Sequence, residues 1–297
     1  MSAAPRAGNG KITVPDIVER KSRRFSDSTS TTEKITCLTA YDYPTARILD
    51  DANVDILLVG DSLAMVVLGY DSTLPITVDE MLHHVKAVRR GTHRALVVAD
   101  MPYGSYHTSI DDSIRAALRF IKEGGAEAVK VEGGERRIEL ISRLVEAEIP
   151  VMGHVGLTPQ SVNALGGFKV QGRSADAAQQ LLRDAHAVEA AGAFSIVLES
   201  IPREIAARIT GDLHIPTIGI GAGPDCDGQV LVINDALGLT VGHRPKFSRR
   251  YANLSEIIAR AAAEYCDDVR NDRFPSDEES YHLPAELRSR FLARERA

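Results

Sequence analysis

Tryptophan is absent from the 297-residue chain, and the aromatic residues make up only 5% of it. The hydrophobic core must therefore be aliphatic, built mainly from Val, Ile, Leu and Ala. No apolar run approaches the ~20 residues that a membrane-spanning helix needs, and the first residues lack the apolar stretch of a signal peptide. We therefore expect a soluble, cytoplasmic protein with no membrane partner.

Cysteine is also scarce, and acidic residues outnumber basic ones. The three cysteines (Cys37, Cys226 and Cys266) lie far apart, with no CxxC pair and no histidine at ligand spacing. This pattern argues against a structural zinc site and is typical of a reducing compartment. The net charge of −6 argues against a nucleic-acid partner, because proteins that bind nucleic acids usually carry a basic face.

The ends of the chain differ in composition from its middle. Residues 1–30 include a charged stretch rich in Ser and Thr, so we expect a loosely ordered lead-in there, with a short helix after Pro15. Residues 31–272 are expected to form a single catalytic barrel domain, and residues 253–272 have the pattern of an amphipathic helix. Residues 273–297 are polar and are expected to form a C-terminal tail.

Short aliphatic segments alternate with amphipathic stretches through the middle of the chain. This alternation is typical of parallel strands whose faces are covered by helices. Eight strand candidates favour a closed (β/α)₈ TIM barrel over an open doubly wound sheet. The expected strands lie within residues 35–41, 55–61, 94–102, 128–134, 150–156, 195–200, 216–223 and 229–235.

The last two expected strands break the alternation. Only the few residues from Gly223 to Gly228 separate them, which is too short for a crossover helix. Either an extended turn joins the two strands, or one of them is misassigned.

Polar side chains occupy five consecutive expected strand ends, where the active sites of such barrels lie. A single residue of this kind is most simply explained as the cap of a turn or helix. All of them together would crowd at the barrel mouth, which favours a shared site. Lys130 and Glu132 alternate with valines and so share one face, and ionised groups are rarely buried unless they are paired or bound to a metal. The candidates are Asp61, Ser62, Asp100, Lys130, Glu132, His154, Glu199 and Ser200.

Three of these candidates are carboxylates that would converge at the mouth. Asp61, Asp100 and Glu132 would repel one another unless a cation lay between them. All three are oxygen donors without a cysteine nearby, which suits Mg²⁺ more than Zn²⁺. The sequence therefore predicts a magnesium site.

Long segments of the chain resemble the ketopantoate (3-methyl-2-oxobutanoate) hydroxymethyltransferase family. The similarity runs from about Lys34 to Leu239 and includes "DILLVGDSLAMVVLGYDSTLPIT", "ALVVADMPYGSY", "AVKVEGG", "PVMGHVGLTPQSVNALGGFKVQGR" and "IPTIGIGAGPDCDGQVLVINDALGL". The resemblance implies a barrel of the phosphoenolpyruvate/pyruvate type. It also implies transfer of a hydroxymethyl group from 5,10-methylenetetrahydrofolate to 3-methyl-2-oxobutanoate (α-ketoisovalerate), giving 2-dehydropantoate for pantothenate and coenzyme A biosynthesis, by a homo-oligomer that is often a decamer.

The resemblance also implies roles for individual residues. Asp61 in "VGDS", Asp100 in "VAD" and Glu132 in "VKVEGG" look like Mg²⁺ ligands. Ser62 and Lys130, together with the two aspartates, would contact the keto acid. Lys130 would supply a positive charge to the substrate carboxylate while balancing Glu132.

Two further residues look like parts of the same pocket. Glu199 in "VLES" resembles the proton acceptor of the family, and His154 in "MGHVGLTPQ" is similar to its pocket histidine. The chain departs from the family pattern at Ala64, where glycine is expected, and at Ser200, where cysteine or another small residue is common. The long connection from Gly156 to Arg173 is expected to be a loop over the active site.

Two alternatives remain beside the hydroxymethyltransferase. One is another magnesium-dependent C–C lyase or mutase on the same barrel, although lyases of that group usually carry a reactive cysteine loop. The other is a non-catalytic barrel that serves as a binding or assembly scaffold. The folate donor rests on the resemblance alone, because the sequence shows no recognisable folate pocket.

Overall fold

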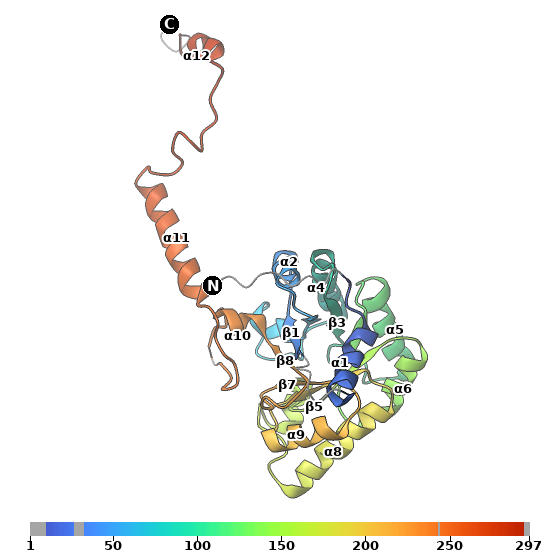
Figure 1. Cartoon of the computed structure of the whole chain (residues 1–297). Helices are drawn as coiled ribbons and strands as arrows, with labels where there is room; N and C mark the ends of the chain where they lie inside the picture. Colours follow the sequence, from blue (N-terminus) through green and yellow to red (C-terminus); the bar gives the residue numbers. More distant parts are fainter. Residues whose placement is uncertain (1–9, 27–32, 243, 294–297) are drawn as a thin grey trace. The chain divides into compact units, whose positions relative to one another are not determined.

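The computed structural model describes residues 10–26, 33–242 and 244–293. Eight parallel strands close into a barrel in chain order, and β1 pairs with both β2 and β8 (Figure 1). The predicted (β/α)₈ barrel is therefore confirmed. The strands are β1 (Ile35–Thr39), β2 (Ile56–Val59), β3 (Leu96–Asp100), β4 (Ala128–Glu132), β5 (Val151–Gly156), β6 (Ser195–Glu199), β7 (Thr217–Ile220) and β8 (Gly228–Leu231).

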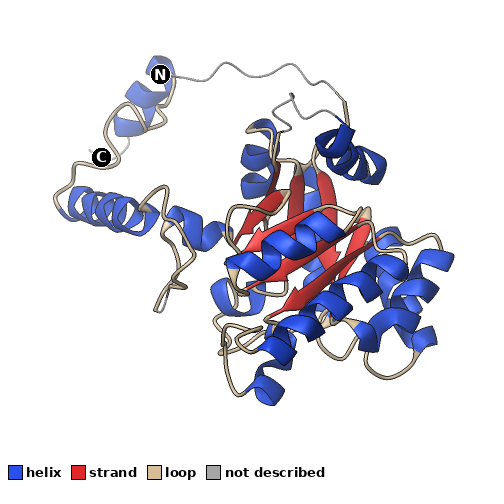
Figure 2. Ribbon diagram, turned by 60° about the horizontal axis from the view of Figure 1, so that its bottom comes forward, coloured by secondary structure: helices blue, strands red, loops and turns tan. Residues whose placement is uncertain are grey.

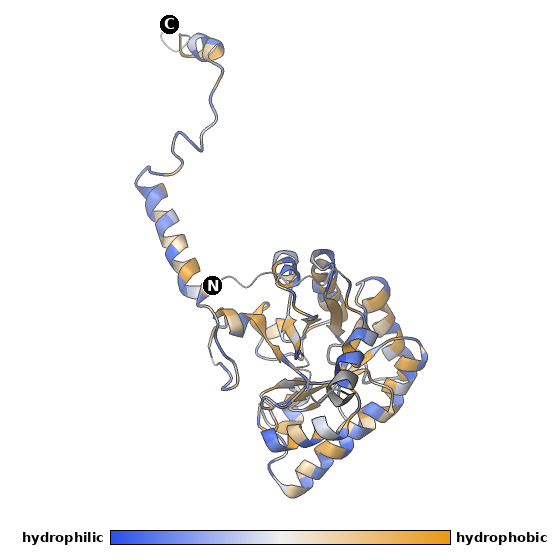
Figure 3. Ribbon diagram, in the orientation of Figure 1, coloured by the Kyte–Doolittle hydropathy of each residue, from blue (hydrophilic) through white to orange (hydrophobic). Residues whose placement is uncertain are grey.

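Helices cover the outside of the strands (Figure 2). Their exposed and packed faces differ in polarity, so hydrophilic and hydrophobic colours alternate along them in Figure 3. The α-helices of the barrel unit are α1 (Val14–Ser26), α2 (Tyr43–Asp51), α3 (Leu63–Val66), α4 (Val78–Gly91), α5 (Ile110–Lys122), α6 (Ile138–Glu146), α7 (Val162–Leu165), α8 (Ala175–Ala190) and α9 (Arg203–Asp212). Two 3₁₀ helices, η1 (Glu135–Arg137) and η2 (Pro159–Ser161), follow β4 and β5.

An extended turn joins β7 to β8 without a helix, which answers the question that the short spacing left open. The two strands pair directly in parallel, with Ile218 opposite Gly228. The carboxylate of Asp227 accepts a hydrogen bond from the backbone N–H of Thr217 at 2.9 Å, which ties the end of the turn to the start of β7. Both predicted strands are therefore present.

The helix α1 packs against the starts of the barrel strands. Ile12 and Ile17 belong to the same buried aliphatic cluster as the first residues of β1 to β4. Lys21 of α1 is also buried, and its Nζ forms an ion pair with Asp227 at 2.8 Å. An ion pair out of water is costly to break, because loss of either partner leaves an uncompensated charge.

This arrangement differs from the loosely ordered lead-in expected over residues 1–30. Residues 10–26 fold against the barrel, whereas residues 1–9 and 27–30 lie outside the described residues. Among residues 14–21 of α1, whose side chains the structure describes, Ile17 and Lys21 are buried and the others are at least partly exposed. The polar composition of this segment therefore concealed its contribution to the core.

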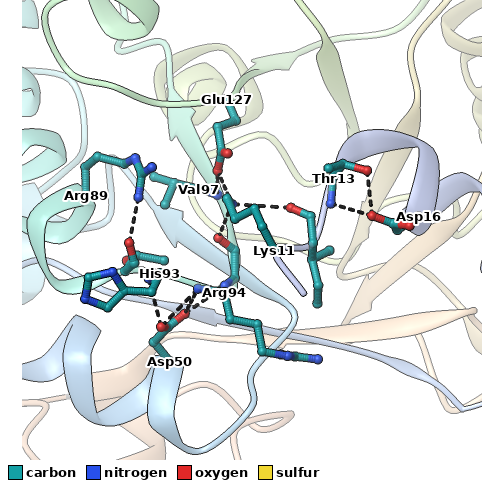
Figure 4. Close-up of polar contacts among 12 residues, drawn as sticks. Lys11, Thr13, Asp16, Asp50, Arg89, His93, Arg94, Val97 and Glu127 are labelled. Atoms are coloured by element: carbon teal, nitrogen blue, oxygen red, sulfur yellow. Dashed lines mark hydrogen bonds and ion pairs between the residues drawn. The ribbon is translucent and has the colours of Figure 1, made fainter. Parts of the chain in front are cut away.

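The segment before α1 is anchored near the start of β3 by polar contacts (Figure 4). Lys11 Nζ donates to Glu127 Oε2 at 2.5 Å and to the main-chain oxygen of Ala95 at 2.7 Å. Close by, the Asp50 carboxylate accepts hydrogen bonds from the backbone N–H groups of residues 93–95 at 2.7–3.1 Å. Burial opposes the charge of Asp50, but these hydrogen bonds outweigh it and lower the pKa of the carboxyl below its ordinary value.

The chain divides into two compact units, and the barrel unit ends at residue 249 rather than at 272 as expected. The second unit comprises residues 237–239 and 250–297. It contains α11 (Leu254–Arg270), where the amphipathic helix was predicted, and α12 (Ala285–Ala293), while α10 (Ile233–Leu237) lies at the boundary. In the described ranges, no helix is long and apolar enough to cross a membrane.

Candidate active site

The barrel register brings the predicted residues together at the carboxyl ends of neighbouring strands. Asp100, at the end of β3, lies opposite Lys130 of β4. Glu132, at the end of β4, lies opposite His154 of β5. Asp61 follows β2 by two residues, and its backbone N–H donates to Asp100 Oδ2 at 3.0 Å. These five side chains are all buried, so the cluster lies inside the barrel rather than on its surface.

Lys130 is the cationic centre of the cluster. Its Nζ lies 3.1 Å from Asp100 Oδ1 and 3.2 Å from His154 Nδ1. Burial disfavours the charged ammonium, but the carboxylates of Asp100, Glu132 and Asp61 outweigh it and raise the pKa of Lys130. The side chain therefore remains protonated and available to an anionic ligand.

The carboxylates carry more negative charge than Lys130 alone can balance. Burial, followed by the charges of Asp100 and Glu132, raises the pKa of Asp61 well above its ordinary value. Burial also raises the pKa of Asp100, although Lys130 works against this shift. Burial opposes the charge of Glu132 as well, but contacts with His154 and Lys130 outweigh it and lower its pKa.

His154 lies between two carboxylates. Its Nδ1 is 3.4 Å from Glu132 Oε1, and its Nε2 is 3.2 Å from Glu199 Oε2, at ion-pair distance but without the alignment of a hydrogen bond. Burial and the neighbouring Lys130 oppose protonation of the ring. The contacts with Glu132 and Glu199 outweigh both and raise the pKa of His154 to about 9, so the ring is charged at neutral pH.

The chemistry of the cluster fits a hard divalent cation. Asp100 Oδ1 and Glu132 Oε1 are buried and accept no hydrogen bond, although each has a cationic neighbour. Buried carboxylate oxygens in this state are suited to Mg²⁺, which prefers oxygen ligands. Among the described residues, no three His, Cys, Asp or Glu side chains are arranged as a preformed metal cage.

Glu199 and Ser62 flank the cluster. The Glu199 side chain, at the end of β6, is 15% exposed, against 4% for those of Asp100 and Glu132, so it is more open to solvent. Ser62 Oγ lies 2.9 Å from the hydroxyl of Tyr41. Ser200, next to Glu199, has a φ of +49°, a left-handed conformation that a bulky or β-branched residue would adopt only with strain. Ala64, the other departure from the family pattern, is buried in α3.

Two neutral residues at the site were not among the sequence candidates. Gln160 of η2 donates from Nε2 to Asp61 Oδ2 at 2.8 Å, and its backbone N–H donates to Glu132 Oε2 at 3.1 Å. The hydroxyl of Tyr106, in the connection from β3 to α5, donates to Gln160 Oε1 at 2.5 Å. A search for charged strand ends misses both. For Gln160 the available signal was the long connection after β5, which was expected to lie over the active site.

Comparison with known sequences gives consistent matches over most of the chain. The sequence model of the family described as "Ketopantoate hydroxymethyltransferase" matches residues 19–277. A relative from Koribacter versatilis named "3-methyl-2-oxobutanoate hydroxymethyltransferase" is 55% identical, covering 97% of this chain and 95% of its own. A protein of the same name from Carboxydothermus hydrogenoformans is 57% identical, covering 87% and 94%.

Solved structures that resemble the fold are far less similar in sequence. Phosphonopyruvate hydrolase in complex with oxalate and Mg²⁺ matches with a TM-score of 0.55 at 14% identity, covering 96% of this chain and 97% of that one. A 2,3-dimethylmalate lyase, described as a member of the PEP mutase/isocitrate lyase superfamily, matches with a TM-score of 0.53 at 15% identity, covering 96% and 93%. At this identity the likeness concerns the fold alone, and it agrees with the closed parallel barrel of this chain.

Proposed function

Since the chain belongs to the ketopantoate hydroxymethyltransferase family, we propose that it transfers a hydroxymethyl group to 3-methyl-2-oxobutanoate to give 2-dehydropantoate, a step of pantothenate biosynthesis. The protein is thus a transferase. The observation that carries the proposal is the joining of Asp61, Asp100, Lys130, Glu132 and His154 into one buried cluster at the barrel mouth. We further propose 5,10-methylenetetrahydrofolate as the donor and Mg²⁺ as the cofactor.

Lys130 is the proposed anchor for the carboxylate of the keto acid. It is buried, it keeps its positive charge, and it lies against Asp100 at the centre of the cluster. Its charge-assisted hydrogen bond to the substrate would form out of water, where such bonds are strong. Ser62 lies beside Asp61, and its hydroxyl can donate to the same substrate.

The cation would be held by Asp61, Asp100 and Glu132. When bound, Mg²⁺ supplies a Lewis acid that stabilises the negative charge which develops on the keto oxygen during proton loss. The two buried oxygens without a hydrogen bond, Asp100 Oδ1 and Glu132 Oε1, support this assignment.

Glu199 is the proposed base that removes the proton from C3 of the keto acid. Its carboxylate is the more accessible one beside the cluster, and His154 faces one of its oxygens at 3.2 Å. The methylene carbon of the folate donor is bonded to two nitrogens. The carbanion formed at C3 then attacks this carbon, so that a C–C bond forms as the first C–N bond breaks. Water cleaves the second C–N bond and supplies the new hydroxyl group, while the proton from C3 and one proton of the water end on the two nitrogens, which releases tetrahydrofolate.

The lyase or mutase alternative has less support at this site. Cys37 lies in β1, Cys226 precedes β8 and Cys266 lies in α11, so none belongs to the connections that follow β2 to β6. The 2,3-dimethylmalate lyase among the structural neighbours is 15% identical, which shows the shared fold and not the reaction.

A product assay tests the proposed reaction. We expect the purified full chain to form 2-dehydropantoate from 3-methyl-2-oxobutanoate only when methylenetetrahydrofolate is present, as followed by mass spectrometry. Exhaustive chelation should abolish the product and added Mg²⁺ should restore it. Product formed without the folate would exclude the proposed donor, and full activity after chelation would exclude the cation.

A further inference from the structure

Gln160 connects the loop after β5 to two carboxylates of the active-site cluster. Its Nε2 donates to Asp61 Oδ2 at 2.8 Å and to the main-chain oxygen of Met101 at 2.9 Å. Its backbone N–H donates to Glu132 Oε2 at 3.1 Å. One residue of η2 therefore holds one oxygen of Asp61 and one oxygen of Glu132.

The orientation of the Gln160 amide follows from its partners. The main-chain carbonyl of Met101 can only accept, so the NH₂ group must face it, and the same NH₂ group then reaches Asp61 Oδ2. This leaves Oε1 for the hydroxyl of Tyr106, which donates to it at 2.5 Å. Because an amide oxygen can only accept, the Tyr106 hydroxyl is the donor of this bond.

The Tyr106 ring is itself held in place. The guanidinium of Arg137 lies 5.0 Å from its centroid, and the ring of His107 packs against it at 4.3 Å. Tyr106 thus gives Gln160 a fixed partner, and the two residues form a neutral brace across the ends of β2 and β4.

The brace and the backbone of Asp61 together determine which oxygens of Glu132 and Asp100 remain free of hydrogen bonds. The backbone N–H of Gln160 donates a hydrogen bond to Glu132 Oε2, and the backbone N–H of Asp61 donates one to Asp100 Oδ2. The other oxygens of these two residues, Glu132 Oε1 and Asp100 Oδ1, are buried and accept no hydrogen bond. In metal sites, hydrogen bonds of this kind fix the orientation of the ligating carboxylates.

We infer that Gln160 is a positioning residue for the divalent cation, and that Tyr106 acts on the site through Gln160. The inference rests on the proposed function, because it takes Asp61, Asp100 and Glu132 to be the ligands. Without the amide, Asp61 loses a restraint on its carboxylate, and the apoprotein must order that group when the cation binds. The affinity for the cation therefore falls even in the absence of keto acid and folate.

Binding of Mn²⁺ to the full-length apoprotein, followed by the EPR signal of the free ion, tests this inference without any turnover. Gln160→Met keeps the length of the side chain and the backbone N–H that donates to Glu132, but it removes the hydrogen bonds of the side chain to Asp61, Met101 and Tyr106. We expect it to weaken Mn²⁺ binding by roughly 10–100-fold. Gln171→Met is the matched control in the same loop, because the Gln171 amide donates to the main-chain oxygen of Lys169 instead. It should bind Mn²⁺ as the wild type does.

A double-mutant cycle tests whether Tyr106 acts through Gln160. Tyr106→Phe removes a single oxygen and should weaken Mn²⁺ binding by about 2–10-fold. Combined with Gln160→Met, it should add less than about twofold, because its partner is already gone. Independent, additive effects would overturn the role assigned to Tyr106.

Unchanged Mn²⁺ affinity in a folded Gln160→Met protein would overturn the inference while leaving the proposed function intact. If Gln160→Met gives no thermal unfolding transition and is therefore not folded, the milder Tyr106→Phe variant decides. Wild-type Mn²⁺ affinity in Tyr106→Phe would then overturn the inference equally. A wild-type protein that binds no Mn²⁺ would refute the proposed cation site, and the inference with it.

Discussion

His154 lies between Glu199 and Glu132, with Nε2 3.2 Å from Glu199 Oε2 and Nδ1 3.4 Å from Glu132 Oε1. One charged ring therefore joins the carboxylate proposed to take the substrate proton to a carboxylate proposed to hold the cation. Lys130 lies on the Nδ1 side of the ring. The proposed base and the proposed substrate anchor are thus parts of one connected cluster.

Replacement of Lys130 tests the substrate anchor. Lys130→Met removes the charge that lies 3.1 Å from Asp100 Oδ1. We expect the KM for the keto acid to rise by about 10–100-fold, since a charge-assisted hydrogen bond contributes about 1.5–3 kcal/mol. The apoprotein should also lose about 3–5 kcal/mol of stability, because Asp100 is left buried without its partner.

Steady-state kinetics and denaturant unfolding measure these two effects. Lys122→Met, on the exposed surface of α5, is the matched control and should leave both quantities unchanged. Wild-type KM and stability in Lys130→Met would mean that Lys130 neither anchors the substrate nor pairs with Asp100 in solution.

Replacement of Ile17 tests whether α1 is part of the barrel core. Ile17 is fully buried among the first residues of the strands, so Ile17→Ala should cost about 2–5 kcal/mol in unfolding free energy. The kcat of the folded protein should not change, because the active site lies at the other ends of the strands. Ile48→Ala is the control, since Ile48 is 67% exposed on α2 and should cost less than about 0.5 kcal/mol. Equal stability of the two variants would contradict the packing of α1.

Asp50 should make an acid-sensitive contribution to stability. Its folded pKa lies below the ordinary value of 3.8, so its contribution is present above that pH and is lost as the pH falls through the folded value. Asp50→Asn should therefore cost about 1–3 kcal/mol at pH 7, since backbone N–H groups lose their charged acceptor.

Urea unfolding of both proteins at several pH values measures this effect. The difference between wild type and Asp50→Asn should narrow as the pH falls below 3.8, whereas the exposed neighbour Asp51→Asn should show little difference at any pH. If the difference in unfolding free energy between the wild type and Asp50→Asn did not depend on pH, the assigned hydrogen bonds of Asp50 would be contradicted.

The sequence predicts the strands and the charged part of the site for a simple physical reason. Strands of a parallel barrel are buried on both faces and therefore appear as continuous aliphatic runs, and charged residues within or after such runs stand out. Lys130 and Glu132 within "AVKVE" could be identified in this way. The barrel register then brings them against residues of the neighbouring strands.

The remaining features depend on contacts that no local pattern encodes. A lysine within a polar stretch such as that of α1 is expected to face solvent, yet Lys21 is buried and its partner Asp227 lies 206 positions further along the chain. Gln160 is neutral and lies in a loop, so its link to Asp61 becomes visible only once the strand ends are assembled. The amphipathic pattern of α11 predicts a helix, but it does not indicate which unit of the chain the helix belongs to.

Hydrogen exchange at C3 of the keto acid is the most direct test of the central claim that Glu199 is the base of a keto-acid enolising site. The measurement follows 3-methyl-2-oxobutanoate by proton NMR in D₂O with Mg²⁺ and wild-type protein, with tetrahydrofolate added in a parallel sample in case a folate must close the site. Glu199→Gln keeps the shape of the side chain but cannot accept the proton, and Glu204→Gln is the control on the exposed surface of α9. We predict exchange in the wild type and the control, and a rate about 10²–10⁴-fold lower in Glu199→Gln. Wild-type exchange in Glu199→Gln, or no exchange by the wild type in either sample, would contradict the account.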